Sequence, residues 1–268
     1  MQKNVIVTAV KGMCVGGTML VPGVSGGSMA MILGIYDKLV SSVSSFMKHK
    51  KQSILFLGTF SIGAVIGMVL FAKPLLSLIE RFPMIMLYFF IGAVAGGIPM
   101  IYEKASVGKF SFKSIIYLVM GIAIVMLLSM VPKEVFNSQG ESIVGIIFLV
   151  AAGIVAAIAL VLPGISVSYM LLLMGMYDKT MRAISEFYLP YLLPIGIGIM
   201  IGIILTTRIL EKAMTNHPQL TYMIILGFII GSMIEVFPGV PKGFELIISL
   251  VMLYAGYKII RVVSKIQN

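Results

Sequence analysis

The chain has 268 residues, of which 59% are apolar and 11% charged, with a mean hydropathy of +1.09 and a formal net charge of +10. Soluble domains carry about 25% charged residues, so this composition excludes an ordinary soluble fold. Apolar runs of about 20 residues recur along the chain, and their apolar residues are continuous rather than alternating, which predicts helices and not a β-barrel. We therefore predict an all-α, polytopic membrane protein.

The charge and the reactive residues exclude several functions. Net positive charge in a membrane protein is typical of Lys- and Arg-rich cytoplasmic loops, so it does not indicate a nucleic-acid partner. The single cysteine, Cys14, excludes an internal disulfide, and the two histidines, His49 and His217, lie in loop-like segments. We expect no metal site, no cofactor and no catalytic residue, because the sequence contains no nucleophile–base pair, Walker loop or HExxH motif.

The first elements in chain order form a broken helix. An apolar run at 5–20 ends at VPGVSGGS, and a short segment follows at 25–46. Pro22 removes a backbone donor and Gly23 permits a tight turn, so the helix is expected to break there. Neither piece comfortably spans about 30 Å of hydrocarbon, which predicts a re-entrant hairpin at about 5–46.

Three longer apolar runs follow this hairpin, and the whole arrangement then recurs after a polar linker, PKEVFNSQGE. The first membrane repeat is expected at 1–134, with spans at about 53–79, 84–101 and 112–131. The second repeat is expected at 140–268, with a hairpin at about 142–187 and spans at about 191–210, 219–235 and 244–260.

The two halves read as copies of one unit. At a shift of 141 residues, VPGVSGGSMAMILGIYDK lies on LPGISVSYMLLLMGMYDK, and beyond Phe46 and Phe187 the shift becomes 135. Apolar bias alone would not place PG-x-S followed by GxYDK twice at one offset, so we infer an internal duplication. Glycine pairs such as Gly63-xxx-Gly67 also recur, and they predict close helix packing.

The topology follows from the number of crossings. One re-entrant hairpin and three full spans give each half an odd number of crossings, which predicts an inverted repeat. With the N-terminus in the cytoplasm, 13 of the 20 Lys and Arg residues fall inside, six fall outside and Lys11 lies within the membrane. We therefore expect both termini in the cytoplasm. If each break completed a crossing, the repeats would instead be parallel. Lys11 also interrupts the first apolar run, so no cleavable signal peptide is expected.

The two PG breaks are the candidate binding site. Non-helical backbone at membrane depth is tolerated only where protein or a wet cavity covers it. Serines after each break suit the start of a half-helix, whose free N–H groups and positive dipole end attract anions such as phosphate. The alternative is a structural kink that only shapes the bundle. The expected phosphate-binding residues are Pro22, Gly23, Ser25, Gly26, Gly27, Ser28, Pro163, Gly164, Ser166 and Ser168.

Five further residues are candidates for contact with substrate or for ion coupling. Lys11 qualifies because an intramembrane lysine is expensive to keep, although it can also snorkel to the interface. Tyr36, Asp37, Tyr177 and Asp178 lie where each hairpin is expected to leave the apolar layer, and interfacial anchoring is the alternative role for the tyrosines.

The duplicated motifs, VPGVSGGSMAMILGIYDKL and LPGISVSYMLLLMGMYD, resemble those of the polyprenyl-phosphate transporter family over nearly the full chain. Met19 and Val167 depart from the usual family pattern. Members of that family translocate undecaprenyl phosphate, the lipid carrier of bacterial envelope and peptidoglycan synthesis.

The resemblance implies a flippase in the bacterial cytoplasmic membrane and not an enzyme. It would move the carrier from the outer to the inner leaflet by alternating access and so recycle it. The implied partners are the polyprenyl phosphate, the membrane and a coupled proton or sodium ion. Whether the protein forms a homodimer is left open. The residues alone also leave open a secondary transporter of a small anionic solute, a membrane-embedded lipid-phosphate enzyme and a non-transporting assembly factor.

Overall fold

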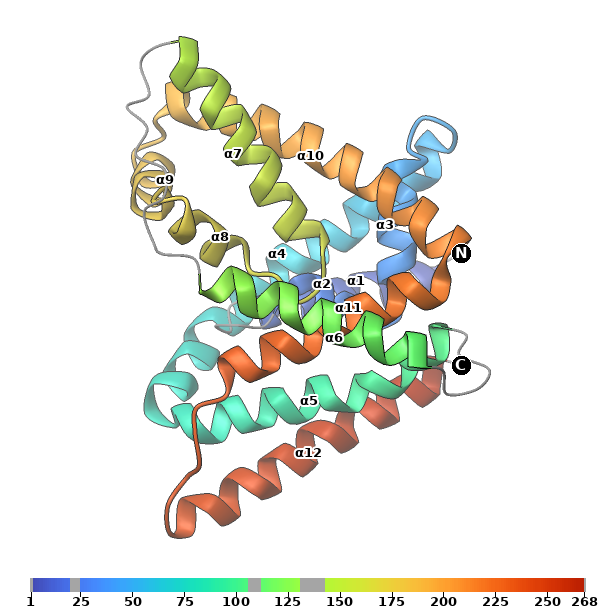
Figure 1. Ribbon diagram of the computed structural model, residues 1–268, viewed down its shortest axis with the longest axis vertical. Helices are drawn as coiled ribbons and strands as arrows, with labels where there is room; N and C mark the ends of the chain where they lie inside the picture. Colours follow the sequence, from blue (N-terminus) through green and yellow to red (C-terminus); the bar gives the residue numbers. More distant parts are fainter. Residues whose placement is uncertain (1, 20–24, 106–111, 131–142, 268) are drawn as a thin grey trace.

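The computed structural model describes residues 2–19, 25–105, 112–130 and 143–267, and these residues form helices without any strand (Figure 1). The first half contains α1 (Gln2–Thr18), α2 (Gly26–Ile32), α3 (Tyr36–Ser44), α4 (Lys50–Arg81), α5 (Pro83–Lys104) and α6 (Phe112–Ser129). The second half contains α7 (Ile143–Val161), α8 (Val167–Leu173), α9 (Tyr177–Ser185), α10 (Leu189–Asn216), α11 (Pro218–Val236) and α12 (Phe244–Gln267). The predicted all-α class is confirmed.

Six of these helices, α4, α5, α6, α10, α11 and α12, are long and apolar enough to cross a membrane. They lie at the six predicted spans, and their length and composition agree with a multi-pass membrane protein. Several extend beyond the apolar run that predicted them, because polar residues continue the helix outside its apolar part. The helix α10, for example, ends at Asn216 rather than near residue 210.

The long helices pack in four pairs. Within each half, the helix before the break packs along the first span, so α1 lies on α4 and α7 lies on α10. The remaining pairs cross between the halves, because α5 packs on α12 and α6 packs on α11 (Figure 1). Corresponding elements of the two halves thus exchange partners reciprocally, which is the contact pattern of a two-fold arrangement.

Glycines hold each pair at close range. A Cβ on Gly67 would lie 2.1 Å from the Met13 carbonyl oxygen, and one on Gly198 would lie 2.1 Å from the Val150 oxygen. The same holds across the exchanged pairs, where a Cβ on Gly92 would lie 1.9 Å from the Leu253 oxygen. Small residues let helix backbones approach in this way, so the predicted packing role of the Gly-xxx-Gly pairs is confirmed.

The replacement Gly92→Val is expected to destabilise the protein by at least about 3 kcal/mol, because overpacking costs typically 1–3 kcal/mol and here the obstacle is backbone. The matched control is Gly58→Val, since a Cβ at Gly58 meets nothing within 4 Å. Thermal unfolding in detergent measures the difference. Equal melting temperatures for the two variants would contradict the assigned α5–α12 contact.

The reciprocity fails at the short helices. The helix α3 packs against α10, and Val40, Leu210 and Met214 belong to one buried cluster. Among the described residues, α9 makes no comparable contact with α4. Val40 is 3% exposed, whereas Met181, its counterpart at a shift of 141, is 49% exposed. The first half therefore packs onto the second through α3 and α10. The equivalent contact of the second half with the first, between α9 and α4, is not made to a comparable extent among the described residues.

Candidate functional site

The start of α2, just after the first break, meets the second break. A Cβ added to Gly27, in the first turn of α2, would lie 3.2 Å from the Cα of Pro163. Nearby, the Tyr36 hydroxyl donates a hydrogen bond of 2.7 Å to the carbonyl oxygen of Val161, at the end of α7. The structure thus brings together motifs that lie more than 100 residues apart in the sequence.

The second break is fully described. After α7 ends at Val161, Pro163 and Gly164 form a turn, and α8 begins at Val167. Gly164 has φ +85°, and a Cβ there would lie 2.5 Å from the carbonyl carbon and oxygen of Phe228 on α11. The Ser166 hydroxyl accepts a hydrogen bond of 3.4 Å from the Tyr169 amide, so this serine caps α8 as predicted. Ser168 lies exposed on α8.

The first break is described only from Ser25 onward, and the predicted residues Pro22 and Gly23 lie outside the described residues. Ser25 is the N-cap residue of α2, but its side chain makes no capping hydrogen bond. Ser28 is buried, and its hydroxyl has no hydrogen-bond partner within the described part of the chain. Gly26 lies against the side chain of Met19.

A small cavity lies beside these serines. Its volume is about 20 Å³, and its lining includes Ser25 and Ser28 from the first half, Ser232 from α11 and apolar residues of α5. A water molecule needs about 10–15 Å³ measured in this way, so the cavity has room for one water and not for a phosphate group. In this conformation, therefore, the space beside Ser25 and Ser28 is too small for a phosphate group.

Two short helices follow each break, α2 and α3 in the first half and α8 and α9 in the second, where the sequence predicted one continuous segment. A left-handed glycine separates them, Gly34 with φ +62° before α3 and Gly175 with φ +64° before α9. The repeated GxYDK sequence thus encodes this turn and the first turn of the following helix. The glycine at the same place in both motifs was the signal for it.

The five remaining candidates occupy different environments. Tyr36 is 3% exposed and so is packed inside the protein, while Tyr177 is only half-buried. Asp37 forms an ion pair with Lys104 of α5, whereas Asp178 is exposed. Lys11 is half-buried on α1 and lies within electrostatic reach of Lys38 and Lys104. Lys104 thus links Asp37, its ion-pair partner, to the surroundings of Lys11, whereas the second half has an exposed Asp178 and Ala152 at the position that matches Lys11.

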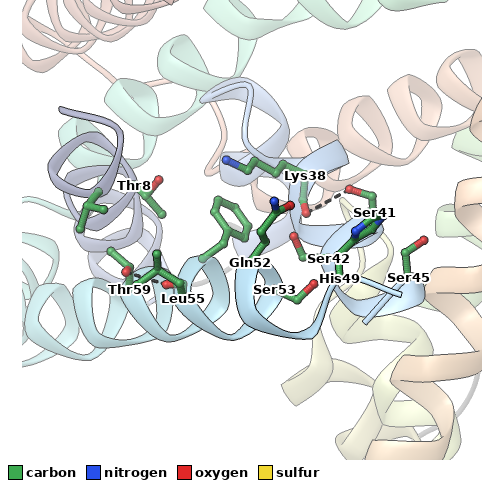
Figure 2. Close-up of a pocket in the computed structure, with 12 residues that line it drawn as sticks. Thr8, Lys38, Ser41, Ser42, Ser45, His49, Gln52, Ser53, Leu55 and Thr59 are labelled. Carbon is green, nitrogen blue, oxygen red and sulfur yellow. Dashed lines mark hydrogen bonds between the residues drawn. The ribbon is translucent and has the colours of Figure 1, made fainter. Parts of the chain in front are cut away.

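Sequence reasoning missed a larger pocket between α1, α3 and the start of α4. Its volume is about 430 Å³, and hydroxyl groups, one amide, His49 and Lys38 line it (Figure 2). Three serines of the 41–45 segment, Ser41, Ser42 and Ser45, face this pocket. Only the folded arrangement of the three helices reveals it.

The variant Tyr36→Phe is expected to lower the free energy of unfolding by about 1–3 kcal/mol, the cost of leaving a buried acceptor unpaired. Loss of the Tyr36 hydroxyl would leave the Val161 carbonyl oxygen without this hydrogen bond, at the contact between the two halves. Tyr177→Phe is the control, because that tyrosine is the repeat counterpart and is not fully buried. Chemical or thermal unfolding in detergent measures both, and an equal effect of the two changes would contradict the role assigned to the Tyr36 hydroxyl.

These features define a multi-pass helical membrane protein whose duplicated polar motifs meet in the bundle. Comparison with known proteins makes the assignment more specific. A family model described as "VCA0040-like: Undecaprenyl phosphate translocase-like" matches residues 15–244. The chain is 34% identical to a polyprenyl-phosphate transporter of Staphylococcus aureus, over 96% of this chain and 95% of that protein. It is 29% identical to a polyprenyl-phosphate transporter of Vibrio cholerae, over 88% of this chain and 78% of that protein.

The chain therefore belongs to the undecaprenyl phosphate translocase-like family, as the resemblance of its motifs predicted. These relatives are named as transporters and not as enzymes, in agreement with the prediction of a transporter. No solved structure matches the chain.

Proposed function

We propose that this protein translocates undecaprenyl phosphate, a polyprenyl-phosphate lipid carrier, from the outer to the inner leaflet of the bacterial cytoplasmic membrane. The observation that carries the proposal is the meeting of the two PG motifs, with Gly27 against Pro163. A lipid phosphate needs polar groups for its head group in the middle of an apolar bundle, and this is where the chain supplies them. Return of the carrier to the inner leaflet would recycle it for envelope synthesis.

The proposed phosphate site consists of the backbone and hydroxyl groups at the two breaks, from Pro22 to Ser28 and from Pro163 to Ser168. The buried, unpartnered Ser28 hydroxyl supports this site, because a buried polar atom without a partner is costly unless a ligand or water uses it. Ser166 already caps α8 and would orient the N–H groups of its first turn. The cavity beside Ser28 would have to widen before the phosphate enters.

We propose that the two repeats, 1–134 and 140–268, are inverted and that α1–α3 and α7–α9 are re-entrant hairpins, with both termini in the cytoplasm. The reciprocal packing of α5 on α12 and α6 on α11 supports a two-fold relation between the repeats. The length of α1 supports the first hairpin, because its 17 residues make it shorter than each of the six long helices, whereas α7, with 19 residues, is as long as α11. A tag in the linker at 132–141 tests the topology, and labelling of that tag from the cytoplasm would overturn it.

The unequal packing of the short helices supports alternating access. In the proposed topology, the contact of α3 with α10 lies toward the cytoplasm and the open place between α9 and α4 lies toward the outside. The described conformation would then be closed toward the cytoplasm. Closure of α9 onto α4, with release of α3 from α10, would expose the phosphate to the other side. We expect that transport is coupled to the movement of a proton or a sodium ion.

Reconstitution tests this function directly. Purified protein is placed in liposomes with labelled undecaprenyl phosphate, and exchange of the label between leaflets is followed over time. We expect exchange well above the rate of protein-free vesicles. We expect the protein not to accelerate the exchange of labelled undecaprenol, which lacks the phosphate. Vesicles with protein that exchange the phosphate no faster than empty vesicles would refute the proposal.

A further inference from the structure

The pocket between α1, α3 and α4 has the size and lining of a ligand site. Its volume of about 430 Å³ falls in the range of about 300–1,000 Å³ that is usual for small-molecule pockets. Figure 2 shows side chains of α3, including Lys38 and Ser42, on one side and those of α4, including Gln52 and Ser53, on the other. The polar groups are neutral donors together with one lysine and one histidine, and no carboxylate lines the pocket.

The charges around the pocket are unbalanced. Lys38 lies over the Phe56 ring, with its Nζ 4.5 Å from the ring centre, and it has no carboxylate partner among the described residues. Lys11, three residues after the pocket residue Thr8, likewise has none and lies within electrostatic reach of Lys38. Asp37 pairs with Lys104, and Glu211 accepts a hydrogen bond from Ser44.

The pocket belongs to the first half alone. The lysine is duplicated, since Lys179 stands where Lys38 stands in the first motif. The pocket serines are not duplicated, because Ser41, Ser42 and Ser45 correspond to Arg182, Ala183 and Glu186. If these serines served only the fold of the hairpin, both copies would need similar residues. Their restriction to one copy points to a function at one end of the bundle.

We propose that this pocket binds the phosphate monoester head group of a polyprenyl phosphate. It would be a second binding site for the lipid, at the end of the bundle near the N-terminus. The identity of the lipid rests on the proposed function, whereas the preference for a phosphate monoester rests on the pocket itself. Lys38 and the serine hydroxyls supply charge and donors for the phosphate oxygens. The remaining volume and the apolar side chains of Val5, Leu55 and Phe56 accommodate the first isoprene units.

Binding of geranyl phosphate, a soluble isoprenyl monophosphate, tests this proposal on the full-length protein in detergent by isothermal titration calorimetry. The variant Lys38→Gln is expected to weaken binding at least about tenfold, the loss that follows removal of a charge-assisted hydrogen bond. Gln52→Glu, at an exposed position, is expected to weaken binding as well by repelling the phosphate. Lys179→Gln is the matched control and is expected to bind like the unmodified chain.

Inorganic phosphate and geraniol are titrated beside geranyl phosphate to separate the possible ligands. Equal binding of geranyl phosphate by the unmodified chain, Lys38→Gln and Gln52→Glu would overturn the pocket assignment. Binding of inorganic phosphate as tightly as geranyl phosphate would overturn its assignment to a lipid head group. Gln52→Glu keeps the test decisive if Lys38→Gln does not fold.

The liposome assay is read separately from these titrations. If geranyl phosphate binding depends on Lys38 while undecaprenyl phosphate is not exchanged, the pocket stands and the proposed function falls. If undecaprenyl phosphate is exchanged but geranyl phosphate binding does not depend on Lys38, the proposed function stands and the pocket assignment falls.

Discussion

The variant Gly164→Ala is expected to lower the rate of undecaprenyl phosphate exchange at least about tenfold, because small misplacements of positioned groups are costly. Two effects act at this one position. The residue has φ +85°, in the region where a side chain adds about 1–2 kcal/mol of strain. The added methyl would also lie 2.5 Å from backbone atoms of Phe228, which cannot rotate aside. The turn must therefore shift away from α11, and Pro163 must shift relative to Gly27.

The chain offers a control that separates these two effects. Gly239 has φ +89°, but a Cβ there meets nothing within 4 Å. Gly239→Ala therefore carries the strain of the left-handed backbone without the steric contact, and it is expected to preserve exchange. Leaflet exchange in liposomes and thermal unfolding in detergent are measured for both variants. If Gly164→Ala exchanged the lipid as fast as Gly239→Ala, the turn would not position the phosphate site.

Much of this fold was readable from the sequence because its signals are local. Long apolar runs predict long helices whatever surrounds them, and all six expected spans are present. The PG-x-S sequence also has a local meaning, since proline and glycine end a helix and serine begins one. Ser166 accordingly caps α8. The recurrence of these signals at one offset then exposed the duplication.

The remaining features depend on which helices meet, and periodicity does not contain that information. Lys38 and Lys179 occupy identical GxYDK sequences, yet Lys38 lines a pocket and Lys179 is exposed on α9. Tyr36 and Tyr177 differ in burial for the same reason, since α3 is packed on α10 and α9 is not packed comparably on α4. A duplicated sequence predicts two equal environments. In the proposed alternating-access mechanism, each of the two states makes these environments unequal.

A cross-link between α9 and α4 is expected to stop transport. In the described conformation, Val40 of α3 is buried in one cluster with Leu210 and Met214 of α10. The repeat relation assigns the equivalent closure on the other side to Met181, opposite Leu75 and Ile79. Met181 is now 49% exposed. If the two sides alternate, Met181 must approach Ile79 during each cycle, because the closed arrangement of one repeat becomes that of the other.

The double variant Met181→Cys, Ile79→Cys, made with Cys14→Ser, tests this motion. Oxidation is expected to form a disulfide and to reduce lipid exchange to the rate of protein-free liposomes, and a reducing agent is expected to restore it. Each single-cysteine variant is the control and should exchange lipid equally well under both conditions. Disulfides need their Cα atoms within about 7 Å, so bond formation itself reports the closed approach of α9 to α4. Full exchange by the cross-linked protein would show that transport does not require this helix to open and close.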